Sequence, residues 1–213
     1  MRLCTHTRIR TRAHTHSALP FINMDNSDVE YFRKRMEERQ SQRIIDGEEM
    51  NEDLVRLICA SNDGYDTPEL NDKLYLHFKG FSRICNLESF TACKSLWLES
   101  NRIEVIENID HMTQLASLFL HNNRIRTIEG LDSFEFLVTL NLSSNMIEMV
   151  QGLSHLRNLQ TLNLSKNLLG PVESISHLAE CTSVTNLDVS SNNITDPAAL
   201  EVSLGLLIDR AWA

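Results

Sequence analysis

The chain has 213 residues, of which 42% are hydrophobic and 23% are charged, so it can form one or two domains with a sizeable core. Its formal net charge of −9 is unevenly placed, because residues 1–24 contain four arginines and no acid, which leaves 16 basic and 29 acidic side chains, a balance of −13, in the remainder. An acidic surface disfavours nucleic acid and anionic membranes as partners. No apolar run approaches the roughly 20 residues of a membrane span.

The first 24 residues differ from the rest, because threonine, histidine and arginine alternate there with little apolar content. Three interpretations compete: a mitochondrial transit peptide, a metal-binding segment built on His6, His14 and His16, or a disordered segment without function, which we favour. A run of Thr-His and Thr-Arg is also what a CA-rich dinucleotide tract encodes. We therefore hypothesise that Met24 is the natural start.

Residues 25–65 are predicted to form a helical segment that caps the N-terminal end of the fold. The stretch from Ser27 to Glu30 has the form of a capping box. Asn51 is a candidate N-cap for a second helix, which we expect to end near Ser61. Three apolar residues of this second helix are expected to point inward: Leu54, Leu57 and Ile58.

Residues 66–197 hold six similar units. Each unit begins with two apolar residues around a variable one, at a spacing of 22 residues with 25 before the last: Leu74-Tyr-Leu76, Leu96-Trp-Leu98, Leu118-Phe-Leu120, Leu140-Asn-Leu142, Leu162-Asn-Leu164 and Leu187-Asp-Val189. In five units an asparagine lies three residues after the second apolar residue: Asn101, Asn123, Asn145, Asn167 and Asn192. Its side chain can bond backbone groups at a tight bend. This is the leucine-rich-repeat pattern LxxLxLxxNxL. It predicts an α/β solenoid with parallel strands on the concave face, because no unit can bury its apolar face alone.

The segments that return from one strand to the next carry apolar residues three apart, as in Ile106, Ile109 and Met112. That spacing suits 3₁₀ or short helical turns on the convex face. The fourth return, which runs from residue 172 to residue 184, is three residues longer. We expect a fuller helix there.

Positions between the inward leucines face the concave surface and are the informative ones for function. The central position holds Tyr75, Trp97, Phe119, Asn141, Asn163 and Asp188. The next outward position holds His77, Glu99, His121, Ser143, Ser165 and Ser190. Three adjacent strands thus present aromatic side chains, whose large area and low conformational entropy suit a protein-binding hot spot. The alternative is that the rings only cover one another as a stabilising row.

No signature of catalysis is found: the sequence has no phosphate loop, GxSxG elbow, HExxH pair or dinucleotide fingerprint. We predict no catalytic residue, metal or cofactor, although His77, Glu99 and His121 could be imagined as a metal or acid/base cluster. The five cysteines form no CxxC pair, and Cys93 is expected to be a small buried hydrophobe. Extracellular leucine-rich repeats usually carry disulfide-bonded caps, so this cysteine pattern favours a reducing compartment.

The segment YDTPELNDKLYLHFKGFSRICNLE at residues 65–88, followed by LWLESNRI at residues 96–103, resembles the start of the repeat domain in the dynein axonemal assembly factor 1 family. The likeness is specific between about Tyr65 and Ile106 and generic from there to Pro197. It implies a phosphatase-regulator-type repeat and a non-enzymatic role in the cytoplasm of ciliated cells. Members of that family help dynein arms assemble before delivery to motile cilia, so the implied partners are dynein chains and chaperone or co-chaperone components.

Two functional classes remain: the dynein-assembly scaffold, and a regulatory subunit that binds a phosphatase or another enzyme through the same face. Residues 198–213 depart from the family pattern, which would continue with a further repeat and a cap. We therefore expect a truncated form. It should be a monomer unless the uncapped last repeat self-associates.

Overall fold

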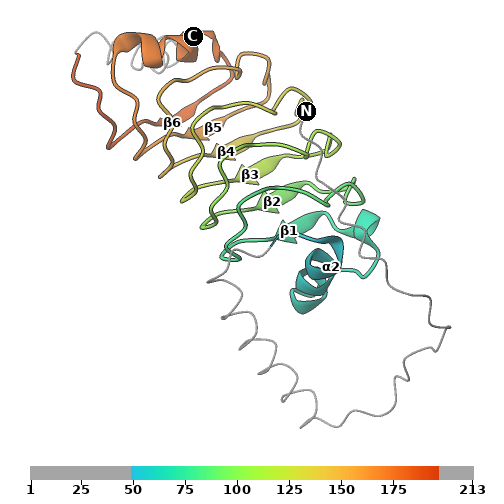
Figure 1. Ribbon diagram of the computed structural model, residues 1–213. Helices are drawn as coiled ribbons and strands as arrows, with labels where there is room; N and C mark the ends of the chain where they lie inside the picture. The colour runs from blue at the N-terminus through green and yellow to red at the C-terminus, as the bar shows by residue number, and fades with distance from the viewer. Residues whose placement is uncertain (1–48, 197–213) are drawn as a thin grey trace, which may run out of the picture. The chain divides into compact units, whose positions relative to one another are not determined.

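Six short strands form one parallel sheet in the order β1-β2-β3-β4-β5-β6 in the computed structural model, which describes residues 49–196 (Figure 1). The strands are β1 Lys73–Tyr75, β2 Ser95–Trp97, β3 Ser117–Phe119, β4 Thr139–Asn141, β5 Thr161–Asn163 and β6 Asn186–Asp188. Neighbouring strands pair one repeat apart, so Leu74 lies beside Leu96. The predicted α/β solenoid is confirmed. Predictions for residues 1–48 and 197–213, including the N-terminal interpretations, the capping box and the tail, lie outside the described residues.

The first five repeats bury both leucines of their triplet on the inner side of the sheet, whereas Leu187 and Val189 of the sixth repeat are half-buried. Leu96 and Leu98 are 0% exposed, as are their counterparts in the first five repeats. The backbone ladder continues just beyond each strand, since the N–H of Leu98 donates to the Phe119 carbonyl at 2.8 Å. Two residues after the second apolar residue, the chain then turns through a residue with φ between 54° and 57°: Phe78, Ser100, Asn122, Ser144, Lys166 and Ser191.

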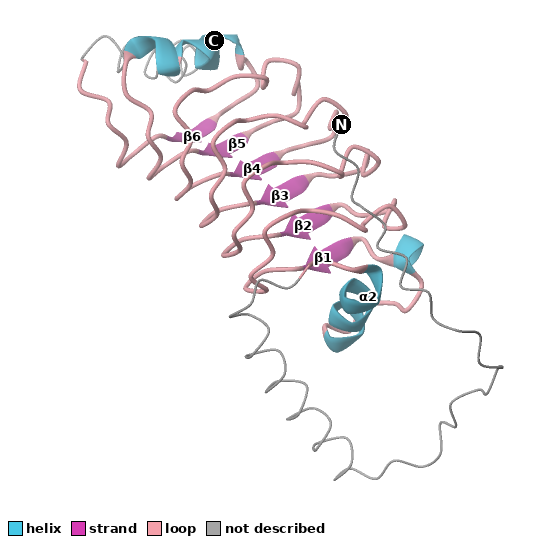
Figure 2. Cartoon of the chain, in the orientation of Figure 1, coloured by secondary structure: helices cyan, strands magenta, loops and turns pink. Residues whose placement is uncertain are grey.

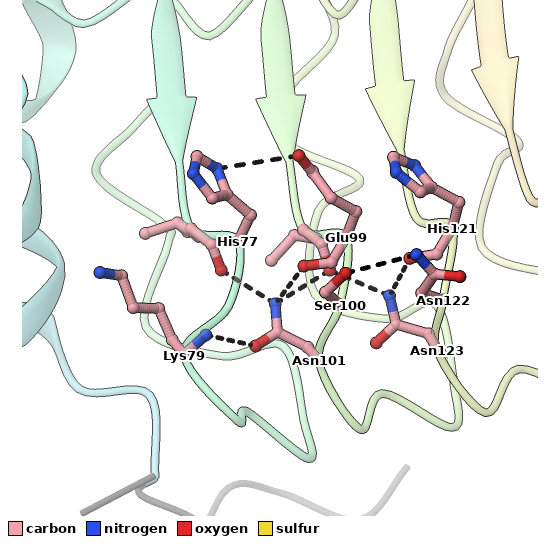
Figure 3. Close-up of polar contacts among 10 residues, drawn as sticks. His77, Lys79, Glu99, Ser100, Asn101, His121, Asn122 and Asn123 are labelled. Atoms are coloured by element: carbon pink, nitrogen blue, oxygen red, sulfur yellow. Dashed lines mark hydrogen bonds and ion pairs between the residues drawn. The ribbon is translucent and has the colours of Figure 1, made fainter. Parts of the chain in front are cut away.

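The repeat asparagines join neighbouring repeats through their side-chain amides. Asn123 donates from Nδ2 to the carbonyls of Leu98 and Leu120 at 2.9 and 3.0 Å, and its Oδ1 accepts from the N–H of Ile103 at 3.0 Å. Equivalent bonds are made by Asn101, Asn145, Asn167 and Asn192. Asn101 and Asn123 are visible at this level of the stack in Figure 3. Because buried backbone groups are costly when unpaired, these amides stabilise the bend that ends each strand.

Most of the chain between the strands is drawn as loop in Figure 2. In the return from β2 to β3 the buried residues close successive turns, since Met112 N–H donates to the Ile109 carbonyl at 2.9 Å and Leu115 N–H to the Met112 carbonyl at 3.0 Å. The fourth return holds two 3₁₀ helices, η2 Val172–Ser174 and η3 Ser176–Glu180. Among the described returns this one is the most helical, as expected, but its helix is of the 3₁₀ type and is interrupted at Ile175. Its buried residues, Ile175, Leu178, Cys181 and Val184, lie three apart, which fits three residues per turn better than 3.6.

Helix α2 Glu52–Ser61 contacts β1 at the N-terminal end of the sheet. The Asn51 side chain caps it by accepting from the N–H of Leu54 at 2.9 Å. Its buried residues are Val55, Ile58 and Cys59, whereas Leu57 is 46% exposed, so the expected inward position of Leu57 was wrong. Val55, Ile58 and Cys59 share one face at spacings of three and four, and Leu57 points away from it.

A short 3₁₀ helix, η1 Pro68–Leu70, leads into β1. Asn71 follows it and is only 3% exposed. Its Oδ1 accepts from the N–H of Tyr65, and its Nδ2 donates to the carbonyls of Tyr65 and Thr67. This side chain fixes the path of the chain between α2 and the first repeat. Within residues 49–196, no helix combines the length and the apolar character that a membrane crossing needs.

Candidate functional site

Three aromatic rings lie side by side on β1, β2 and β3. The ring centroids of Tyr75 and Trp97 are 4.5 Å apart with planes 22° from parallel, and those of Trp97 and Phe119 are 5.4 Å apart at 13°. Parallel strands lie about 4.8 Å apart, so the register of the sheet brings rings at one repeat position to stacking distance. We call these three residues the aromatic row.

The aromatic row is half-buried at each of its three positions. Trp97 has a neighbour stacked on each of its two faces, so a partner would meet mainly the edge of its indole. The rings thus cover one another and also leave part of their surface exposed. The two interpretations made from the sequence, a binding surface and a stabilising row, are compatible in this geometry.

The next outward position places His77, Glu99 and His121 beside one another at the ends of the same strands (Figure 3). Nδ1 of His77 is 3.8 Å from Oε1 of Glu99, too far for a hydrogen bond. Three atoms here are shielded from solvent and have no hydrogen-bond partner: Nδ1 of His77, Oε2 of Glu99 and Nδ1 of His121. Across residues 49–196, no group of three or more His, Cys, Asp or Glu side chains is arranged to hold a metal ion.

The later strands present polar side chains that satisfy one another. Oδ1 of Asn141 accepts from Ser143 N–H and Oγ–H at 3.1 and 2.9 Å. Asn163 and Ser165 repeat this arrangement at 2.9 and 2.7 Å. The outward positions therefore divide into an aromatic and titratable part on β1 to β3 and a hydrogen-bonded part on β4 and β5.

Asp188 extends the hydrogen-bonded part onto β6. Its Oδ1 accepts from the N–H of Ser190 at 3.0 Å. Hydrogen bonds from the Ser190 side chain and then from its backbone hold the pKa of the Asp188 carboxyl below its ordinary value. A carboxylate that is stabilised within its own strand end offers less to a partner than one without donors.

The cysteines of residues 49–196 lie in buried positions and are not joined by disulfide bonds. Cys93 is 0% exposed, which confirms the prediction of a small buried hydrophobe. Burial raises the pKa of its thiol to about 12. Because the thiolate is the reactive form, Cys93 is not suited to act as a nucleophile.

Three histidines on the returns were missed in the sequence, although they share one repeat position. Nε2 of His111 lies 2.8 Å from the Leu87 carbonyl oxygen, and Nε2 of His155 lies 3.1 Å from that of Leu131. Nε2 of His177 accepts from the N–H of Leu153 at 3.0 Å. Their spacing in multiples of 22 was the available signal. Each bonds the backbone of the preceding repeat, so their role is structural.

Three stretches of the sequence match family models of leucine-rich repeats. Residues 91–133 match Leucine Rich repeats (2 copies), residues 158–178 match Leucine Rich Repeat, and residues 180–203 match Leucine Rich repeat. The same units form the six-stranded parallel sheet. The chain contains leucine-rich repeats.

Among curated proteins, part of this chain is similar to dynein axonemal assembly factor 1. The protein of that name from Homo sapiens is 51% identical over 49 residues, which cover 23% of this chain and 7% of the relative. That from Peromyscus polionotus is 50% identical over 52 residues, which cover 24% and 8%. A homolog from Drosophila pseudoobscura pseudoobscura is 45% identical over 65 residues, which cover 30% and 4%. The aligned stretch thus spans less than a tenth of these relatives' own length.

Solved structures of other leucine-rich-repeat proteins share the fold. An internalin from Listeria monocytogenes is 29% identical with a TM-score of 0.55, over 62% of this chain and 38% of the internalin. A leucine-rich-repeat protein from Leptospira interrogans is 24% identical with a TM-score of 0.59, over 68% of this chain and 38% of that protein. The second similarity shows the fold alone.

Proposed function

We propose that this leucine-rich-repeat protein is a non-enzymatic interaction scaffold for the cytoplasmic preassembly of axonemal dynein arms, and hence for motile cilium assembly. The observation that carries the proposal is the 50% identity over 52 residues to dynein axonemal assembly factor 1. Its partners are dynein chains together with chaperone or co-chaperone components. It acts in the cytoplasm of ciliated cells.

The aromatic row is the surface proposed to hold the partner. Tyr75, Trp97 and Phe119 are fixed by their strands and by stacking on one another, so little side-chain entropy remains to be lost on binding. Aromatic anchors that become buried against a partner are typical hot spots, each worth about 2 kcal/mol or more when truncated. A rigid row of half-exposed rings thus supports capture of a protein rather than turnover of a small substrate.

The test is affinity capture from motile-ciliated cells with the full chain as bait, comparing the wild type with Trp97→Ala/Phe119→Ala. We expect the wild type to retain dynein heavy or intermediate chains and chaperones, and the double variant to lose them. The matched control is Met149→Ala/Leu168→Ala, which removes two exposed apolar side chains that lie outside the row. Circular dichroism should show the same fold in all three proteins.

Three results would count against this proposal. Recovery of a phosphatase catalytic subunit in place of dynein chains would favour the alternative role as a regulatory subunit. Unchanged capture by Trp97→Ala/Phe119→Ala would show that the partner does not use the aromatic row. Independently, depletion of the protein from ciliated cells should leave axonemes without dynein arms in electron micrographs, and intact arms would refute the assembly role.

A further inference from the structure

We propose that Glu99, which lies between His77 and His121, binds an arginine side chain of the partner. We call these three residues the acceptor row. The inference rests on the proposed protein-binding role of the concave face and names the chemistry recognised there. The occupant is an extended segment in which an arginine is flanked by apolar residues.

The first step is the unsatisfied carboxylate. The Glu99 side chain is only 14% exposed, its Oε1 lies 3.8 Å from Nδ1 of His77, and its Oε2 is shielded from solvent without any hydrogen-bond partner. Buried polar groups in native proteins are nearly always paired, and an exception calls for an explanation. An ionised carboxylate only accepts hydrogen bonds, so the missing partner is a donor.

Neighbouring backbone donors are already used within the sheet. The N–H of Phe78 donates to the Glu99 carbonyl at 3.1 Å, and the N–H of Ser100 donates to the His121 carbonyl at 2.9 Å. The N–H of Lys79 donates to Oδ1 of Asn101 at 3.1 Å. These bonds belong to the repeat architecture, so none of these three N–H groups is free to donate to Oε2 of Glu99; because that oxygen is shielded, the Glu99 side chain has to turn outward before a donor of the partner can reach it.

The two histidines define which donor fits. With the proton on Nε2, a neutral imidazole has an acceptor at Nδ1, and Nδ1 of both His77 and His121 lacks a hydrogen-bond partner. In this tautomer the row offers three acceptors on adjacent strands, which a group with several donors and no acceptor satisfies; with its proton on Nδ1, His77 would instead point a donor at Oε1 of Glu99, 3.8 Å away. Guanidinium has five N–H donors in a planar fork, whereas a carboxylate ligand would be repelled by Glu99.

The aromatic row explains why recognition of the cation depends on the carboxylate. Cations bind over aromatic faces, but Tyr75 and Phe119 occupy both faces of Trp97. The exposed ring edges instead suit the aliphatic stem of arginine and apolar residues next to it. Lys73 and Lys79 belong to the first repeat, so like-charge repulsion directs the guanidinium toward the β2 and β3 side of the acceptor row.

The test uses random heptapeptides displayed on phage and selected on the immobilised full chain. Selections run in parallel on the wild type, Glu99→Gln, Trp97→Ala and the control Glu104→Gln, which neutralises an exposed carboxylate of the same repeat. A selected peptide is then synthesised with arginine and with citrulline, its uncharged near-isostere, and binding is measured by fluorescence polarisation. Thermal melts check that each variant is folded.

We expect the wild type and Glu104→Gln to enrich peptides with arginine beside apolar residues. Citrulline should weaken binding to the wild type by roughly 10-fold to 100-fold, as expected for loss of a charge-assisted hydrogen bond. Glu99→Gln should weaken the arginine peptide by a similar factor and no longer distinguish it from the citrulline peptide. Enrichment of peptides without arginine, no enrichment, or equal binding by Glu99→Gln and the wild type would overturn the inference.

The same experiment separates this inference from the proposed function. If Glu99→Gln binds the peptides like the wild type while Trp97→Ala loses them, the aromatic row is a binding surface. The proposal that Glu99 binds an arginine is then wrong. If neither substitution changes binding, the concave face is not the contact surface. In that case neither the arginine site nor the aromatic row is a binding surface, whereas the dynein-assembly role is decided separately by the affinity capture and the depletion experiment.

Discussion

Tyr75 and Trp97 stack with ring centroids 4.5 Å apart and planes 22° from parallel, although they belong to different repeats. Their strands pair in register, with Tyr75 beside Trp97, so the contact is a direct product of the 22-residue spacing. Stacked aromatic pairs stabilise proteins beyond the area that they bury. The same two residues therefore contribute to the stability of the solenoid and to the surface that it presents.

A double-mutant cycle should detect this contribution. Tyr75→Ala, Trp97→Ala and the double variant are compared with the wild type by urea unfolding followed by circular dichroism. We expect a coupling free energy of about 0.5–1.5 kcal/mol, because the pair interaction is lost in either single variant. A cycle of Tyr75 with Phe119, which are separated by Trp97 in the row, serves as the control and should couple less. A Tyr75 and Trp97 coupling near zero would show that the rings are neighbours without stabilising each other.

The repeat asparagines, which we also call the asparagine ladder, predict a larger effect at a single position. Asn145→Ala removes the bonds from Nδ2 to the carbonyls of Leu120 and Leu142 and the bond that Oδ1 accepts from the N–H of Ile125. These groups are buried and cannot recover their bonds in water, so the free energy of unfolding should fall by about 2–4 kcal/mol in urea denaturation. Asn158→Ala, an exposed asparagine with one bond to the Glu135 carbonyl, should change it by less than about 0.5 kcal/mol. Equal effects at the two positions would contradict a structural role for the ladder.

Periodicity in the sequence was sufficient for the fold, the inward leucines and the placement of the aromatic row. These features repeat, and a repeated residue meets its own counterpart in the next unit, so register alone decides what it contacts. The chemistry of the acceptor row could not be foreseen in this way. Whether Oε2 of Glu99 finds a donor depends on the rotamers of two different neighbours, His77 and His121, which no spacing determines.

The errors and omissions occur where the repeat is interrupted. Leu57 belongs to α2, and which face of this helix is buried depends on its contact with β1 rather than on apolar spacing alone. Asn71 bonds groups up to six residues away in a segment with no counterpart in later units. The histidines at positions 111, 155 and 177 do follow the period, but the unit between His111 and His155 has Ser133 instead, which obscures the series.

Two glycines allow two costs of an added Cβ to be measured separately. One is conformational strain, and the other is a clash with the backbone of the preceding repeat. Gly130 and Gly152 have φ of 68° and 66°, so alanine is strained at both positions, at a cost of about 1 kcal/mol. A Cβ at Gly130 would lie 2.4 Å from the Ile106 carbonyl oxygen, whereas at Gly152 the nearest atom, the Ile128 carbonyl oxygen, is 3.6 Å away.

Gly130→Ala should therefore lower the free energy of unfolding by at least about 1 kcal/mol more than Gly152→Ala, because the backbone of two repeats must separate as well. Chemical denaturation of both variants under one set of conditions measures the difference. Asn86 and Asn108 occupy the matching position with φ of 58° and 59°, which shows that a side chain is tolerated where the preceding repeat leaves room. If the two alanine variants were equally stable, the close approach at Gly130 would carry no energetic cost.

Burial of Cys93 predicts a pH dependence of both reactivity and stability. Its thiol is 0% exposed and burial raises its pKa from 9.0 to about 12. The folded protein therefore keeps this proton at a pH at which the unfolded chain releases it. The stabilisation linked to this group is complete below pH 9 and is lost progressively as the pH rises from about 9 to about 12.

Iodoacetamide labelling at pH 9.5, read out by peptide mass spectrometry, tests this protection. We expect Cys93 to remain unlabelled in the native protein and to react fully in urea, because alkylation requires both the thiolate and access to it. Thr91→Cys, an exposed position two residues earlier, is the control and should be labelled within minutes without denaturant. In the Cys93→Ala variant, the free energy of unfolding should decline less between pH 9 and pH 11 than in the wild type, because the variant lacks the thiol whose titration destabilises the folded state. Native labelling of Cys93 as fast as that of the introduced cysteine would mean that this part of the core opens readily, and the stack of repeats would then be far less rigid around β2 than its packing indicates.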